Sequence, residues 1–68
     1  MSASGDDGEI YYTLLGIRLD GVPSVVDVVY APLPSALSRA RALFKEHASC
    51  ISIEIWRDSG LVERLARP

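Results

Sequence analysis

His47 and Cys50 are the residues of this 68-residue chain whose types and spacing come closest to a catalytic arrangement. An imidazole that lies beside a thiol can accept its proton and leave a nucleophilic thiolate. Both residues also have a structural interpretation, because His47 falls at the edge of an amphipathic helix and Cys50 opens a strand. We favour the structural interpretation, since a free cysteine in such a position usually behaves as a small buried apolar residue.

Other arrangements that support catalysis or metal binding are missing from the sequence. Glu54 and Glu63 fall on neighbouring predicted strands, but the expected register sends their side chains to opposite faces and excludes a carboxylate pair. The five glycines are scattered and form no phosphate-binding loop. One cysteine and one histidine form no disulfide and cannot complete a tetrahedral metal site without further ligands. The sequence therefore predicts a protein that is not an enzyme and uses no metal or cofactor.

The composition is that of a folded globular protein, with 49% hydrophobic and 24% charged residues. A net charge of -2 argues against a protein whose whole surface binds nucleic acid or an anionic membrane. The sequence starts without a secretory signal pattern and has no apolar run long enough to span a bilayer, so we expect a cytoplasmic protein. Residues 1–8 are small and acidic and predict a disordered tail, which leaves residues 9–68 as one domain.

A β-hairpin is predicted at the start of this domain. One strand runs from Ile10 to Leu19 and the next from Val25 to Tyr30, and Asp20-Gly21 between them suits a two-residue type I′ turn. This turn would place Tyr11 opposite Tyr30 and Leu15 opposite Val26.

An amphipathic helix and a second hairpin are predicted to follow. Segment 31–34 with its two prolines breaks the strand pattern, and from within it apolar residues recur at helical spacing; they are Leu33, Ala36, Leu37, Ala40, Leu43, Phe44 and Ala48. Segment 50–56 alternates, with three isoleucines on its core side. The loop 58–60 then leads, with Gly60 in the left-handed conformation, into a short strand from Leu61 to Leu65. Its pairing would set Glu54 opposite Arg64 and Trp56 opposite Val62.

The predicted fold is therefore α+β, with a ββαββ order and two layers. We expect a four-stranded antiparallel sheet in the spatial order 2-1-3-4, with the helix on one face. The face away from the helix would carry an unusual number of apolar side chains; these are Tyr12, Leu14, Val25, Val29, Trp56 and Val62. A tryptophan with a tyrosine and aliphatic residues is typical of the centre of a protein interface.

A basic helix face is the competing surface. Arg39, Arg41 and Lys45 lie on or beside the outer side of the predicted helix and could contact phosphates. The alternative interpretation is a solvated helix face, because no aromatic residue alternates with these charges.

The segment Ala-Leu-Ser-Arg-Ala-Arg-Ala-Leu at residues 36–43, followed by Ile-Glu-Ile-Trp-Arg-Asp-Ser-Gly at 53–60, resembles small uncharacterised bacterial ββαββ proteins. That group implies no activity. The opening hairpin and helix also resemble antitoxins with a partial double-stranded-RNA-binding-like fold, although the glycine-cysteine turn of those proteins is missing.

We therefore expect an interaction or regulatory module that binds itself, as a homodimer, or another protein. The contact would use the outer sheet face or an edge strand. The alternative hypothesis is a nucleic-acid-associated regulator that uses the basic helix face.

Overall fold

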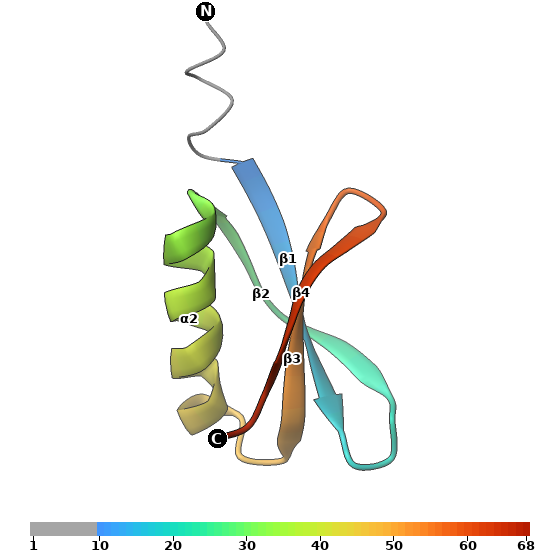
Figure 1. Ribbon diagram of the computed structural model, residues 1–68. Coiled ribbons are helices and arrows are strands. Elements are labelled where there is room, and N and C mark those ends of the chain that lie inside the picture. The colour runs from blue at the N-terminus through green and yellow to red at the C-terminus, as the bar shows by residue number, and fades with distance from the viewer. Residues whose placement is uncertain (1–9) are drawn as a thin grey trace, which may run out of the picture.

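The computed structural model describes residues 10–68 and shows one antiparallel four-stranded sheet with one helix against it (Figure 1). The elements are β1 (Ile10–Arg18), β2 (Pro23–Ala31), α2 (Leu33–Glu46), β3 (Cys50–Arg57) and β4 (Gly60–Ala66), and the strand order is β2-β1-β3-β4. The predicted α+β fold, its ββαββ order and its strand order are confirmed. The predicted tail at residues 1–8 lies outside the described residues. Within residues 10–68 no helix has the length and apolar character needed to cross a membrane.

Helix α2 follows β2 directly, because Pro32 has extended backbone angles and ends the strand. Pro34 lies in the first turn, where its missing N–H group leaves no helical hydrogen bond unmade. The helix ends at Glu46, and its buried stripe consists of predicted residues: Ala36, Ala40, Leu43 and Phe44. Ala48 was also predicted in this stripe, but it lies beyond the helix and is exposed.

The first hairpin follows the predicted register at its open end, from Ile10 to Leu14, but not in the part nearer its turn. Tyr11 lies opposite Tyr30 as predicted, but Leu15 lies opposite Val25 rather than Val26. One extra residue in β2 causes this bulge, which local alternation of apolar residues does not reveal.

The turn of this hairpin also differs from the predicted type I′ turn. The N–H of Gly21 donates to the carbonyl of Arg18 at 2.8 Å, and Gly21 has a φ of 82° whereas Asp20 does not have a positive φ. Asp20 instead accepts a hydrogen bond from the N–H of Val22 through its side chain. The loop between β1 and β2 therefore consists of residues 19–22 rather than of 20 and 21 alone, and Gly21 is its one residue in the left-handed conformation.

The core lies between α2 and the two central strands. Tyr12 and Leu14 of β1 are buried with Ile53 and Ile55 of β3, and Leu14 lies directly opposite Ile55. Directly opposite residues of an antiparallel pair share a face, so Tyr12 and Leu14 face the helix. Val29 also packs against this core. The prediction that these three residues project from the outer face is therefore wrong.

The inversion arises because both faces of β1 carry apolar residues, so that alternation alone does not identify the covered face. Gly16 lies on the covered side, where an added Cβ would lie 2.6 Å from Cys50 Sγ and 2.9 Å from Val26 Cγ1. This absence of a side chain lets Cys50 become buried at the start of β3. Ile51 falls in a register shift and is 46% exposed, which corrects the prediction that it belongs to the core.

The second hairpin confirms one predicted pair and corrects another. Glu54 lies opposite Arg64 as predicted, but Trp56 lies opposite Leu61 because a bulge leaves Val62 as the extra residue of β4. The loop consists of residues 58 and 59, with Asp58 rather than Gly60 at a positive φ.

Candidate interaction surface

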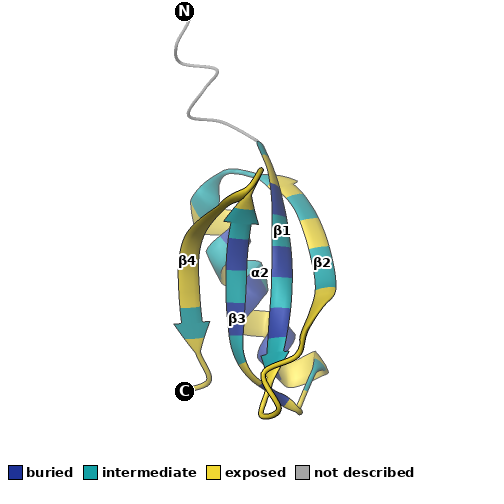
Figure 2. Ribbon diagram, turned by 90° about the vertical axis from the view of Figure 1, so that its right-hand side faces the viewer, coloured by how far each residue is buried: buried dark blue, intermediate teal, exposed yellow. Residues whose placement is uncertain are grey.

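The side of the sheet away from α2 carries apolar side chains on all four strands. Figure 2 looks onto this side, with α2 behind the sheet, and no element within residues 10–68 lies over it. We call it the open face, and the strand pairings assign to it Tyr11, Thr13, Leu15, Ile17, Pro23, Val25, Val28, Tyr30, Ser52, Glu54, Trp56, Leu61, Arg64 and Ala66.

Four large apolar residues of the open face expose more than half of their surface. They are Tyr11 (69%), Val25 (62%), Tyr30 (58%) and Val28 (53%). Tyr11 and Tyr30 are opposite each other and their ring centroids are 4.7 Å apart, so their rings form one aromatic surface. Exposed apolar residues that are contiguous in this way mark a contact surface more often than scattered ones do.

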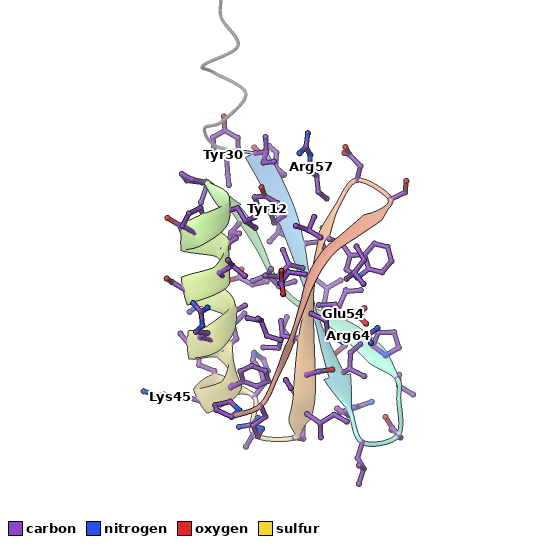
Figure 3. The ribbon with its side chains drawn as sticks, viewed as in Figure 1. Tyr12, Tyr30, Lys45, Glu54, Arg57 and Arg64 are labelled. Carbon is purple, nitrogen blue, oxygen red and sulfur yellow. The ribbon has the colours of Figure 1, made fainter. Side chains whose placement is uncertain are left out.

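One polar cluster lies within the open face. The carboxylate of Glu54 accepts hydrogen bonds from Trp56 Nε1 at 3.0 Å and from Arg64 Nη2 at 2.6 Å. The Glu54 side chain is only 12% exposed, and in Figure 3 it lies with Arg64 on the side opposite to the helix. The indole N–H, and then the guanidinium, hold the pKa of Glu54 below its ordinary value. The charges of this cluster are therefore satisfied within one copy of the chain.

Of the six residues predicted for the outer face, the structure places Trp56 and Val25 on it. Trp56 is half-buried and Val25 is exposed. Val62 is exposed at the bulge of β4, whereas Tyr12, Leu14 and Val29 contribute to the helix side. The residues that sequence reasoning missed are the odd-numbered residues of β1 and their β2 partners, above all Tyr11, Val28 and Tyr30. Alternation in the first hairpin could not have selected them, because the face that the helix covers carries Arg18 and Asp27 and is the more polar of the two.

The basic residues of α2 do not act as one cluster. Arg39 Nε donates to Asp27 Oδ2 at 2.7 Å and Arg39 Nη1 donates to Glu46 Oε2 at 2.9 Å, so the charge of Arg39 is neutralised locally. These carboxylates raise the pKa of Arg39, and Arg39 in turn lowers the pKa of Asp27. Arg41 and Lys45 are exposed, and Lys45 points away from the sheet (Figure 3). Of the three basic residues that were predicted to contact phosphates, only Arg41 and Lys45 are therefore exposed cations without the local pairing of Arg39.

His47 and Cys50 are held by structural contacts. Their backbone carbonyls accept hydrogen bonds from Arg67 Nη2 at 2.8 Å and Arg67 Nε at 2.7 Å, and the Cys50 thiol is buried. The Arg67 guanidinium also lies 5.0 Å from the centre of the Phe44 ring. No group of three or more potential metal ligands from histidine, cysteine, aspartate or glutamate occurs in the part of the chain that the structure describes.

Comparisons of this chain with protein-family models, with curated proteins and with solved structures found no match.

Proposed function

We propose that this protein is a non-enzymatic interaction module that associates with itself by packing the open faces of two copies together. The observation that carries the proposal is the row of exposed apolar residues on the open face, centred on Val25 and Val28. Two sheets that pack face to face bury such rows about 10 Å apart, as in a β-sandwich.

The size of the open face suits such a contact. Four strands of about eight residues, spaced about 4.8 Å apart with a rise of about 3.3 Å per residue, cover roughly 500 Å² in projection. Side chains that stand up from the sheet increase the accessible area toward the roughly 800 Å² that each partner of a standard interface buries. A domain of about 60 residues buries only about 60% of its unfolded surface, so this added burial also stabilises the fold.

The charges of the open face favour a second copy over a charged partner. Glu54 and Arg64 neutralise each other within one chain, and the hydrogen bond from Trp56 uses a further acceptor position of the carboxylate. Two identical faces can therefore meet without placing an unpaired charge in the contact, which would carry a large desolvation cost.

Sedimentation equilibrium of the wild type and of two variants tests the proposal. The wild type is expected to exceed the 7.4 kDa mass of one chain. Val28→Glu places a charge in the open face and is expected to lower the mass at least twofold with an unchanged circular dichroism spectrum. Ala42→Glu, a control on the exposed side of α2, is expected to keep the mass of the wild type. A wild type that remains a single chain at high concentration would contradict the proposal and point to a different partner for the open face.

A further inference from the structure

The two outer edges of the sheet differ in how well they are protected against an added strand. The edge strand β2 begins with Pro23, contains the bulge at Val26 and places the Asp27 carboxylate in an ion pair with Arg39. Proline, bulges and charges are the usual devices that prevent edge pairing. The other edge strand, β4, has its bulge beside the hairpin loop and is regular from Glu63 to Ala66.

The register of β4 identifies the backbone groups on its outer side. The N–H of Arg67 donates to the carbonyl of Ile51, which makes this opposite pair a hydrogen-bonded pair. Hydrogen-bonded pairs alternate along an antiparallel ladder, so Leu65 and Glu63 also direct their N–H and C=O groups toward β3. The N–H and C=O groups of Arg64 and Ala66 consequently point outward, where no strand of residues 10–68 pairs with them.

We propose that β4 pairs antiparallel with β4 of a second copy, with Leu65 on the two-fold axis. In a two-fold symmetric pair one residue of β4 lies opposite the same residue of the partner, and only a few residues can take this central position. One register places Arg64 opposite itself and another places Glu63 opposite itself, and both bring like charges together. The register with Leu65 opposite itself sets Arg64 opposite the partner's Ala66 and Glu63 opposite the partner's Arg67. It is the register that combines an apolar centre with complementary charges.

A groove beside β4 supports this register. Figure 2 shows that α2 crosses behind the sheet obliquely, so that its C-terminal end stands apart from the lower part of β4. The groove left there has a volume of about 180 Å³ and is lined by Arg41, Phe44, Leu65, Ala66 and Pro68. In the proposed pair the Leu65 side chains of both copies lie on the helix side at this groove. The exposed carboxylate of Glu63 then enters a region where Arg41 and Arg67 form no ion pair with any carboxylate of the described residues.

This pairing extends what the open face does. A two-fold axis perpendicular to the sheet keeps both helices on one side and joins the two open faces into one surface across eight strands. Two such surfaces packed together form an assembly of four chains. The edge contact does not depend on the face contact, because it uses the outward backbone groups of β4 and side chains on the helix side rather than the side chains of the open face.

Disulfide trapping tests the register. Residues opposite each other in a non-hydrogen-bonded antiparallel pair have Cα atoms about 4.5 Å apart, within the range that a disulfide spans. Leu65→Cys in the Val28→Glu background, in which face packing is disrupted, is expected to form a linked dimer under mild oxidation. Arg64→Cys in the same background is expected to stay unlinked, as is the parent with its buried Cys50 alone. Linking of Arg64→Cys instead of Leu65→Cys, or of neither variant, would overturn the proposed pairing.

A second pair of variants separates the edge from the face. Ala66→Pro removes an outward N–H group that has no partner within one described chain, and is expected to halve the mass of the wild-type assembly. Ala66→Ser keeps the N–H group and is the matched control. Glu63→Lys opposes the partner's Arg67 and is expected to have the same effect as Ala66→Pro without a proline. An unchanged mass in both Ala66→Pro and Glu63→Lys would overturn the edge pairing. A lower mass in Val28→Glu would still support face packing in that case.

Discussion

The two faces of the sheet are built from similar apolar residues, yet α2 covers one and nothing in residues 10–68 covers the other. Leu14 and Leu15 show how burial differs between the two faces, because they are neighbours in β1 and point to opposite sides of the sheet. Leu14 is fully buried under the helix, whereas Leu15 is only partly buried among open-face residues. The helix completes one core within the chain, and the second apolar surface is the one that the proposed association would cover.

The largest effect is expected from exchanging these two leucines for alanine. Leu14→Ala removes a fully buried side chain and is expected to lower the free energy of unfolding by about 2 to 5 kcal/mol at every protein concentration. Leu15→Ala is expected to have a smaller effect in dilute solution and a larger one as the concentration rises, because association buries its side chain. Urea unfolding at two protein concentrations measures both effects. Equal losses for the two variants at low concentration would contradict the assignment of the faces.

A smaller effect is expected at Gly16, where the side chains of Cys50 and Val26 leave no room for a Cβ. Gly16→Ala would bring its Cβ to 2.6 Å from Cys50 Sγ, and overpacking of this kind typically costs about 1 to 3 kcal/mol. Cys50→Ala removes the sulfur, so the double variant is expected to be less destabilised than the sum of the single variants. Thermal unfolding of the four proteins measures this coupling, and strict additivity would show that the two residues are not in contact.

The smallest effects concern the two carboxylates with lowered pKa values, one on each face. Glu54 is bonded to Trp56 on the open face, and Asp27 is bonded to Arg39 on the helix side. A carboxylate whose pKa is lower in the folded chain stabilises the fold above its ordinary pKa, and this contribution is lost as the pH falls through the folded value. Glu54→Gln and Asp27→Asn are therefore each expected to flatten the loss of stability as the pH falls from the ordinary pKa of the carboxyl group to its lowered pKa in the folded chain.

The contribution of Glu54 to stability is expected to respond to protein concentration, unlike that of Asp27 on the helix side. Its pH dependence is expected to change with protein concentration, because association buries the Glu54 cluster, whereas that of Asp27 is expected to stay constant. Urea unfolding across this pH range at two concentrations provides the measurement. If the free energy of unfolding falls by the same amount at acid pH in the wild type and in Glu54→Gln, the hydrogen bond from Trp56 does not stabilise the charged form of Glu54.

The fold was predictable from sequence because its elements carry separate and strong signals. Pro32 and Pro34 mark the end of a strand and the start of a helix, and the helical stripe through Phe44 is distinct from the alternation around Ile53. The open face was predictable as a feature, but half of its predicted residues were assigned to the wrong side. Bulges at Val26 and Val62 and the close approach of Cys50 to Gly16 set the registers, and these depend on contacts between strands that local patterns do not encode.

Trp56 offers the most direct test of the central claim, that the open face is buried against a second copy. It is the only tryptophan of the chain and lies half-buried on the open face between Thr13 and Leu61. Burial of its indole in an association contact is expected to shift its fluorescence emission to shorter wavelength as concentration rises, along the same curve as the mass in solution. Val28→Glu is expected to keep the long-wavelength emission at every concentration. An emission maximum that stays constant while the wild-type mass rises would contradict the claim, because association would then leave the open face exposed to water.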